Sequence, residues 1–482
     1  MKSILIAYSN PWSFSLAAER EIARRGAKEG RVDVLNLYRL AGRHSPLRRP
    51  VDRAAEMLNR KFERFLLPAV NGRDITSGIR AGKLIPPPLP QDLQSLRSYK
   101  IGPARVGLSV LSTITSITTV QRPTSMDEYG ASLPEAWKSA HLAVEVGLAV
   151  RDLGYDEVYI FNGRHCDTRP FCDILEETAQ VFRYEQGGSG TRFVTTSGSI
   201  HDPMQVVRLI KDHDCDTAVG EKFYQDRLNK APGNPVSFFT STQVEGQIPT
   251  TAAGNEIVSF FTSSTDEMIA VSDTLAYGEF PSQFEVAMAL ARACRRQGAQ
   301  LVVRLHPHLQ YKHESWRREW DMVALAGEGA IVLDPSDPTD TYALIHASRC
   351  VFTCGSTVGF ESVYLNKPCA EVGIRVAGLL GATGLVMNEA EAEAFIAQPA
   401  LPEHARAETI RFGSYATQGG MPLPELEPGS HPYLARVGGK IADPVRFLIR
   451  RVRSTFTKTP YVPLPPGGKI IIEPSVARAM GK

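Results

Sequence analysis

The chain has 482 residues, more than one hydrophobic core commonly supports, so we expect two or more domains. With 43% hydrophobic residues, 22% charged residues and a net charge of +2, it has an ordinary globular composition that indicates no nucleic-acid partner. The seven cysteines form no CxxC pair or disulfide framework, and no apolar run could span a bilayer. These features predict a cytoplasmic protein with reduced thiols and no structural zinc site.

The first residues predict a Rossmann-like beginning. Residues 3–8 form an apolar strand without the shape of a signal peptide. Ser13 is expected to cap a helix that ends at Gly26, and residues 31–37 form a second strand. Since the GxGxxG fingerprint is missing, a bound dinucleotide is not implied.

The middle of the chain predicts further strands that end in polar loops. Residues 101–119 fit either a strand or a buried helix, and residues 134–153 fit a helix. Strands at 157–161 and 181–184 lead to loops that carry Arg164 and Glu185. These two residues form a candidate ligand-binding cluster, or else an exposed turn and a surface carboxylate.

A stretch at 229–256, rich in Pro, Gly, Thr and Asn, predicts a linker between domains. We therefore expect an N-terminal domain at 1–235, a second domain at 236–400 and a C-terminal extension at 401–482. The hexapeptide VSFFTS occurs at Val236 and again at Val258.

The second VSFFTS copy is expected to be the first strand of the C-terminal domain, carrying Ser263, Ser264 and Glu267 to the site. After it, a helix shows an apolar stripe at Phe284, Ala287, Met288 and Ala291. This stripe is typical of a helix that packs on a core.

Three apolar runs, at 301–305, 330–333 and 350–354, predict strands of a parallel α/β sheet. Ligands of such sheets bind outside the carboxyl ends of the strands. The first run ends in Arg304 and His306, which can supply cations, and Pro307 stiffens their loop.

The run at 350–354 leads to Gly355, Ser356 and Thr357, which open a helix. Glycine permits a tight turn, and hydroxyls together with the free N–H groups of a helix start favour a phosphate. Glu361, one turn on, can reach a hydroxyl pair such as that of a ribose. Each feature also has a structural explanation, as a helix cap or turn, and only their combination predicts a nucleotide-phosphate site.

The order R-x-H-P, D-x-x-D-x-Y-x-L-I and S-T-V-G-x-E-(five residues)-K-P resembles bacterial capsule and lipopolysaccharide glycosyltransferases of the GT-B type, including Kdo transferases and sialyltransferases. The resemblance covers about residues 255–375. It implies two Rossmann-like domains of α/β class that face a cleft, an acceptor domain at 1–235 and a nucleotide-sugar-binding domain at 236–400. A weaker resemblance, F-N-G-R…R-P…Y-E-x-G-G, points to Arg164 and Glu185 in the N-terminal half.

This resemblance implies a glycosyltransferase that moves a sugar from a nucleotide-sugar donor, CMP- or UDP-linked, to a growing lipid-linked or oligosaccharide acceptor. The expected catalytic residues are Glu185, Arg164 and His306. The expected donor ligands are Arg304, His306, Ser263, Ser264, Gly355, Ser356, Thr357 and Glu361. A sugar-nucleotide epimerase, a polyol-phosphate transferase and an envelope scaffold remain alternatives.

Cationic side chains and a helix end predict a metal-independent enzyme without a cofactor, because they can neutralise a phosphate themselves. Residues 212–216 (DHDCD) offer metal-ligating side chains, but they follow a predicted helix and fit its solvated end better.

Near the C-terminus, Asp443-Pro444 predicts a helix start. An apolar stripe follows, at Val445, Leu448, Ile449, Val452 and Phe456, with Arg446, Arg450, Arg453 and Lys458 on the remaining surface. Such a helix either lies on an anionic membrane surface, which would make the protein peripheral at the inner membrane, or packs on its own protein.

Overall fold

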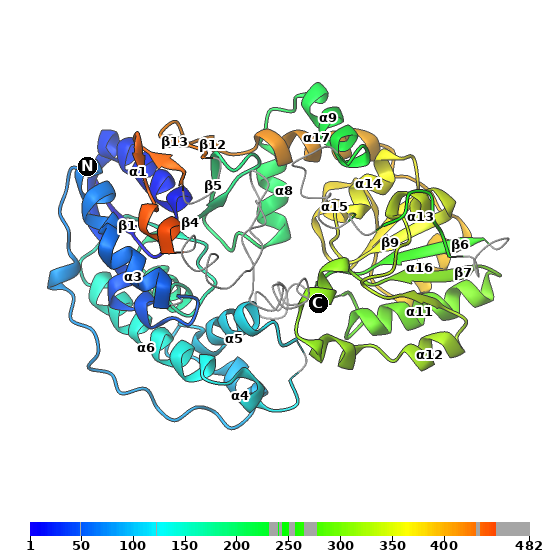
Figure 1. Cartoon of the computed structure of the whole chain (residues 1–482), viewed down its shortest axis with the longest axis horizontal. Helices are drawn as coiled ribbons and strands as arrows, with labels where there is room; N and C mark the ends of the chain where they lie inside the picture. The colour runs from blue at the N-terminus through cyan, green and yellow to red at the C-terminus, as the bar shows by residue number, and fades with distance from the viewer. Residues whose placement is uncertain are drawn as a thin grey trace. The chain divides into compact units, whose positions relative to one another are not determined.

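The computed structural model describes residues 1–48, 50–121, 123–230, 240, 243–249, 256–264, 277–429 and 434–449. The chain divides into two compact units, each with its own sheet (Figure 1). Unit 1 holds Met1–Thr119, Pro123–Ile200 and the described residues from Gly419 on. Unit 2 holds residues 120–121 and the described part of His201–Gln418.

The sheet of unit 1 has the order β12-β5-β4-β3-β1-β2. Strands β1 to β4 are parallel, and β5 and β12 are antiparallel to their neighbours. Its strands are β1 (Lys2–Ala7), β2 (Gly30–Leu35), β3 (Glu157–Phe161), β4 (Gln180–Gln186), β5 (Arg192–Thr196) and β12 (Met421–Pro422). A three-stranded sheet adds β13 (Leu426–Glu427), β14 (Arg436–Val437) and β15 (Lys440–Ile441).

Helices cover both faces of this sheet, because successive strand side chains point to opposite sides. Ile4 and Ile6 of β1 pack with α1, whereas Leu5 and Ala7 pack with α6 and α7. The α-helices of unit 1 are α1 (Ser13–Glu29), α2 (Leu37–Leu40), α3 (Pro50–Asn59), α4 (Leu93–Ser98), α5 (Val106–Thr118), α6 (Ser132–Arg151) and α7 (Arg169–Leu175).

The sheet of unit 2 is parallel throughout, in the order β11-β10-β9-β6-β7-β8. Numbered by appearance, the strands run 6-5-4-1-2-3, the Rossmann order. They are β6 (Ile257–Phe261), β7 (Gln300–Arg304), β8 (Ile331–Leu333), β9 (Ser348–Thr353), β10 (Cys369–Val372) and β11 (Gly384–Val386). The two Rossmann-like domains of α/β class are thereby present.

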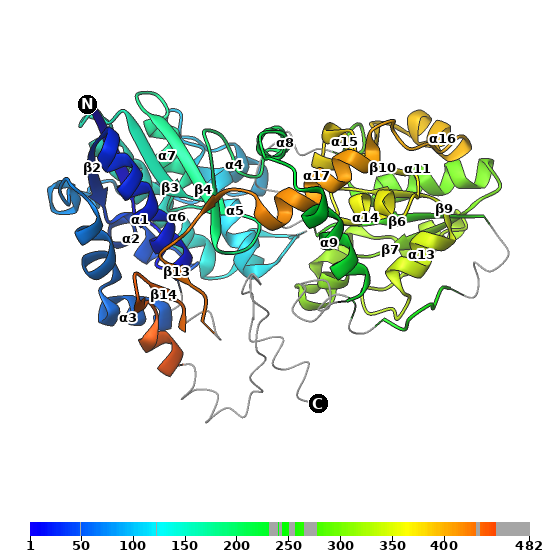
Figure 2. The ribbon, with the colours of Figure 1, turned by 90° about the horizontal axis from the view of Figure 1, so that it is seen from above.

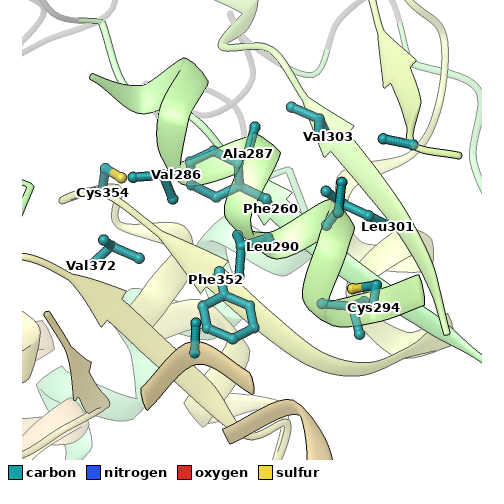
Figure 3. Packing of buried hydrophobic residues seen from close by; sticks show 14 of the residues in the cluster. Phe260, Val286, Ala287, Leu290, Cys294, Leu301, Val303, Phe352, Cys354 and Val372 are labelled. Atoms are coloured by element: carbon teal, nitrogen blue, oxygen red, sulfur yellow. The ribbon is translucent and has the colours of Figure 1, made fainter. Parts of the chain in front are cut away.

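Both faces of the second sheet are buried as well (Figure 2). On one face Phe260 and Phe352 pack against Val286 and Leu290 of α11, as Figure 3 shows. On the other, Phe261 packs with residues of α13 and α14. The helices are α8 (Pro203–Lys211), α9 (Thr217–Leu228), α11 (Gln283–Arg296), α12 (Met322–Gly327), α13 (Thr341–Ala347), α14 (Val358–Tyr364), α15 (Val376–Leu380), α16 (Glu389–Ala397) and α17 (Ala405–Gln418).

The division into units differs from the predicted domains at 1–235, 236–400 and 401–482. Helices α8 and α9 belong to unit 2, because Val207 and Tyr224 pack with Phe360 of α14 and Ile410 of α17. The chain after Gly419 belongs with unit 1, where Leu423 joins the core around β1. The first VSFFTS copy, at Val236, lies outside the described residues except for Thr240, and Glu267 lies outside them as well.

Two local predictions for α1 were wrong. Ser13 is the first helical residue and not the cap, which is Trp12. The helix continues through Gly26, where a Cβ atom would lie 3.0 Å from both Ile4 Cδ1 and Val32 Cγ2. Gly26 therefore permits close packing of α1 on the sheet and does not end the helix. Residues 101–119, whose structure the sequence left open, contain the buried helix α5.

Candidate functional site

The candidate site lies in unit 2, where the order of the parallel strands reverses between β6 and β9. The carboxyl ends of β6, β7 and β9 meet at a pocket lined by Thr262, Arg304, His306 and Ser356. Ligands of open α/β sheets bind at such switch points. The pocket also includes the predicted residues Thr357 and Glu361, so five predicted donor ligands lie around one cavity.

Arg304, the last residue of β7, is 2% exposed although it is charged. Its Nη2 donates a hydrogen bond to the carbonyl of Asp337 over 2.9 Å, and Nη1 lies 3.6 Å from the Asp337 carboxylate. Burial lowers the pKa of Arg304, and the nearby carboxylates of Asp337 and Asp334 oppose that shift. Among the described residues, Nε and Nη1 donate to no acceptor, although buried donors are nearly always paired.

His306 is the cap residue of the short 3₁₀-helix Pro307–Tyr311, and a hydrogen bond within this loop orients its imidazole. The backbone N–H of His306 donates to Thr262 Oγ1 over 2.9 Å. Its ring Nδ1 accepts from the backbone N–H of His308 over 3.1 Å. A neutral imidazole that accepts at Nδ1 carries its proton on Nε2. His306 is therefore arranged to donate a hydrogen bond to an anion from Nε2.

The turn after β9 has the backbone geometry that the sequence predicted. Gly355 has φ +93°, and a Cβ atom there would lie 3.0 Å from Arg375 Cδ. Ser356 Oγ accepts from the backbone N–H of Val358, the first residue of α14, over 3.3 Å. Ser356 and Thr357 line the pocket, whereas Gly355 shapes the turn that presents them.

Arg227 of α9 lines the same pocket and was not predicted. Its Nε donates to Glu361 Oε1 over 2.8 Å and its Nη2 to Thr357 Oγ1 over 2.9 Å. The Glu361 carboxylate, expected at a ribose, is thus 4% exposed and paired with a guanidinium. Burial raises the pKa of Tyr342, which also lines the pocket, and the nearby Glu361 carboxylate adds to that rise.

Ser263 and Ser264 follow β6, but the pocket is lined by their neighbour Thr262. The Ser263 hydroxyl donates to the carbonyl of Cys354 over 2.8 Å, and so links the end of β6 to the end of β9. This contact gives Ser263 a structural role in holding the two strand ends together.

The predicted catalytic residues Glu185 and Arg164 belong to unit 1. Glu185, on β4, is half-buried and accepts from Asn162 Nδ2 over 2.7 Å and from the Gln186 backbone N–H over 3.1 Å. Arg164 follows β3, and its Nη1 lies 3.4 Å from Ser112 Oγ. Asn162 contacts both residues of this pair, and no sequence pattern predicts that contact.

Part of the predicted C-terminal helix is present at 444–449. The expectation that Arg446 lies on its outer surface was wrong: Arg446 is 4% exposed, with Nε 3.2 Å from Asp52 Oδ1 and Nη1 3.8 Å from Asp443 Oδ1. The two carboxylates hold it inward, whereas Leu448 is 60% exposed. Arg450, Arg453 and Lys458 lie outside the described residues.

Within the described part of the chain, no helix combines the length and apolar character needed to cross a bilayer. No cluster of three or more His, Cys, Asp or Glu side chains there is arranged to hold a metal ion.

Comparison with solved structures finds distant likenesses. The chain is similar to Thermosulfurimonas dismutans KpsC, a beta Kdo 2,4 transferase, at 15% sequence identity and a TM-score of 0.36. The match covers 54% of this chain and 78% of the KpsC chain. It is similar to CalG4, the calicheamicin glycosyltransferase, with 12% identity, coverage of 87% and 95%, and a TM-score of 0.28. A putative UDP-N-acetylglucosamine 2-epimerase from Listeria monocytogenes shows 11% identity, coverage of 98% and 100%, and a TM-score of 0.25.

No family model matches the chain, and no curated protein matches it. At such TM-scores the likenesses assign neither a family nor an activity.

Proposed function

We propose that this protein is a glycosyltransferase of GT-B type that takes a sugar from a CMP- or UDP-linked donor. The observation that carries the proposal is the buried Arg304 guanidinium at the strand switch point of unit 2. Two of its nitrogens, Nε and Nη1, donate to no acceptor among the described residues, beside a pocket lined with hydroxyls. Buried cationic donors without acceptors at a ligand-binding edge are what a phosphate-bearing ligand would satisfy.

The departing nucleotide carries negative charge on its phosphate, and catalysis consists largely in stabilising that charge. Arg304 supplies a fixed cation, His306 a donor at Nε2, and Ser356 and Thr357 supply hydroxyls. Because these groups can offset the phosphate charge by themselves, we propose transfer without a divalent metal or other cofactor.

On the acceptor side, we propose that Glu185 of unit 1 takes the acceptor proton or acts as the nucleophile, with Arg164 orienting it or the sugar. If Glu185 is the base, it takes the acceptor proton as the acceptor oxygen bonds to the anomeric carbon and the bond from that carbon to the phosphate oxygen breaks. If Glu185 is the nucleophile, its carboxylate oxygen first displaces the phosphate, and the acceptor oxygen then displaces the carboxylate, which takes the acceptor proton. In both cases the nucleotide leaves with the electron pair of the bond between the anomeric carbon and the phosphate oxygen. The acceptor belongs, in this proposal, to a growing capsule or lipopolysaccharide glycan, lipid-linked or free.

A thermal-shift panel of CMP, UDP, GDP and CDP-glycerol, each at millimolar concentration with EDTA, tests the proposal. A ligand that binds only the folded state stabilises it by about 2.7 kcal/mol at 100 times its Kd. We expect CMP or UDP to raise the melting temperature by several degrees, and more than CDP-glycerol does. A panel in which no nucleotide changes the melting temperature would overturn the proposed phosphate site.

A further inference from the structure

The loop that follows β3 in unit 1 brings an asparagine directly against the Glu185 carboxylate. Asn162 is 7% exposed, and its Nδ2 lies 2.7 Å from Glu185 Oε2. Its Oδ1 lies 3.3 Å from the backbone nitrogen of Arg164. One side-chain amide therefore contacts both residues proposed for the acceptor side.

The orientation of this amide is determined by its two partners. A carboxylate accepts hydrogen bonds only, so the NH₂ group must face Glu185, and a backbone N–H donates only, so the amide oxygen must face Arg164. The second Glu185 oxygen, Oε1, accepts from the Gln186 backbone N–H over 3.1 Å. Each oxygen of the carboxylate is thus held by one N–H group.

The backbone that carries Asn162 has an uncommon conformation. Asn162 has φ +60° and Gly163 φ +76°, two successive left-handed residues. The Asn162 N–H donates to the Tyr184 carbonyl over 2.9 Å, which extends the pairing of β3 with β4 by one residue before the chain turns. At Gly163 a Cβ atom would lie 2.8 Å from Arg183 Nε, so this tight turn needs glycine.

Non-glycine residues adopt such a φ rarely, and they gather at functional sites where the surroundings hold them. Here the turn aims the amide of Asn162 at the end of the neighbouring strand. We propose that Asn162 is a positioning residue that holds the Glu185 carboxylate in its reactive orientation. This inference rests on the role that the proposed function gives to Glu185.

The test measures kcat and KM for release of nucleotide from a CMP- or UDP-linked sugar, with water as acceptor. Asn162→Gly keeps the left-handed turn, which glycine adopts freely, and removes only the amide. Losing a hydrogen bond to a charged group predicts a fall in kcat of roughly tenfold to a hundredfold. KM and the nucleotide-induced thermal shift should stay within twofold of wild type, because donor binding lies in unit 2.

Three further variants separate positioning from folding. Asn162→Asp keeps the size of the side chain and the acceptor for the Arg164 N–H, but it places a second carboxylate against Glu185. Its kcat should fall at least as far as that of Asn162→Gly. If the glycine variant does not fold, this variant tests whether Asn162 positions Glu185. The double variant Asn162→Gly with Glu185→Gln should be no slower than Glu185→Gln alone. Asn36→Ala is the control, because Asn36 is an 8% exposed helix cap of the same unit, and its loss should leave kcat unchanged.

If Glu185→Gln stops turnover and Asn162→Gly keeps kcat within twofold of wild type, the inference is overturned and the proposed function stands. If Glu185→Gln keeps full activity, the role of Glu185 and the inference both fall, while the nucleotide panel still reports on the phosphate site. A lower kcat with a proportionally raised KM would mean that the substitution also disturbs substrate binding and would likewise overturn positioning.

Discussion

Replacing Arg304 with methionine should weaken nucleotide binding without weakening the fold. The side chain is 2% exposed, so methionine, an unbranched apolar residue, can occupy most of its space. The substitution removes two buried nitrogens, Nε and Nη1, that donate to no acceptor among the described residues. It also removes the hydrogen bond from Nη2 to the Asp337 carbonyl and the 3.6 Å ion pair between Nη1 and the Asp337 carboxylate.

The two effects on stability oppose each other. An unpaired buried donor costs about 1–3 kcal/mol, and a hydrogen bond from a charged group contributes about 1.5–3 kcal/mol. Asp337 is 29% exposed and can be hydrated after the change. The ligand-free melting temperature of Arg304→Met should therefore equal or exceed that of wild type.

Binding should respond in the opposite direction. Each charge-assisted hydrogen bond to a phosphate that is lost should raise Kd by roughly 10- to 150-fold, which corresponds to about 1.5–3 kcal/mol. Calorimetric titration with the nucleotide that gives the largest thermal shift measures this change. Arg295→Met is the matched control, because Arg295 is a 64% exposed arginine of α11 that pairs with Glu328, and Kd should not change there.

A Kd within twofold of wild type in Arg304→Met would refute the reasoning, since the guanidinium could then not contact the phosphate. A large drop in the ligand-free melting temperature would refute it as well. That result would mean that the buried cation stabilises the fold and is not held for a ligand.

Other outcomes follow from the same structure. His306→Ala and Ser356→Ala should each weaken nucleotide binding roughly tenfold or more and leave the melting temperature of the ligand-free protein nearly unchanged. Titration calorimetry measures the affinities of both variants, and values within twofold of wild type would remove these residues from the site. EDTA should leave turnover unchanged, and activity that is lost in EDTA and restored by magnesium would contradict the metal-independent proposal. Burial raises the pKa of Glu371 to about 7. The folded protein therefore holds this proton more tightly than the unfolded chain does, and the free energy of unfolding falls as the pH rises from the ordinary pKa of a glutamate through 7. Glu371→Gln should therefore gain stability relative to wild type between pH 5 and pH 8, by up to about 3 kcal/mol in denaturant unfolding, and a pH-independent difference would contradict this. The membrane-surface alternative for the C-terminal helix predicts that the full chain pellets with anionic vesicles at low salt and that removal of all residues after Ile449 abolishes pelleting while nucleotide binding stays intact. A full chain that does not pellet, or a truncated chain that still does, would exclude the C-terminal segment as a membrane contact.

The strands of both sheets could largely be predicted because their apolar runs are short and bounded by turn residues. The predicted strand at 157–161 coincides with β3, and the run at 301–305 with most of β7. Gly26 misled the prediction because its role depends on contacts with Ile4 and Val32, which local sequence does not show. Which unit α8 and α9 would join could not be predicted either, because tertiary packing decides it.

The candidate site, like the fold, could be predicted only in part. Arg304, His306 and Ser356 could be grouped in advance, because carboxyl ends of parallel strands meet at one edge of a sheet. The hydrogen-bond partners of the site residues could not be predicted, because they depend on tertiary packing. Arg227, for example, reaches Glu361 only because α9 packs beside α14. Likewise, the inward position of Arg446 depends on Asp52, almost four hundred residues earlier in the chain, and no helical periodicity reports such a contact.

The fate of a sugar nucleotide in the presence and absence of an acceptor glycan tests the central claim most directly. The protein would be incubated with CMP- and UDP-linked sugars in EDTA, and ³¹P NMR and mass spectrometry would follow the nucleotide and the sugar. A transferase predicts that release of nucleotide accelerates with acceptor and that the acceptor gains one sugar mass. Isomerisation of the sugar nucleotide without acceptor and without release of nucleotide would contradict the account and identify an epimerase instead.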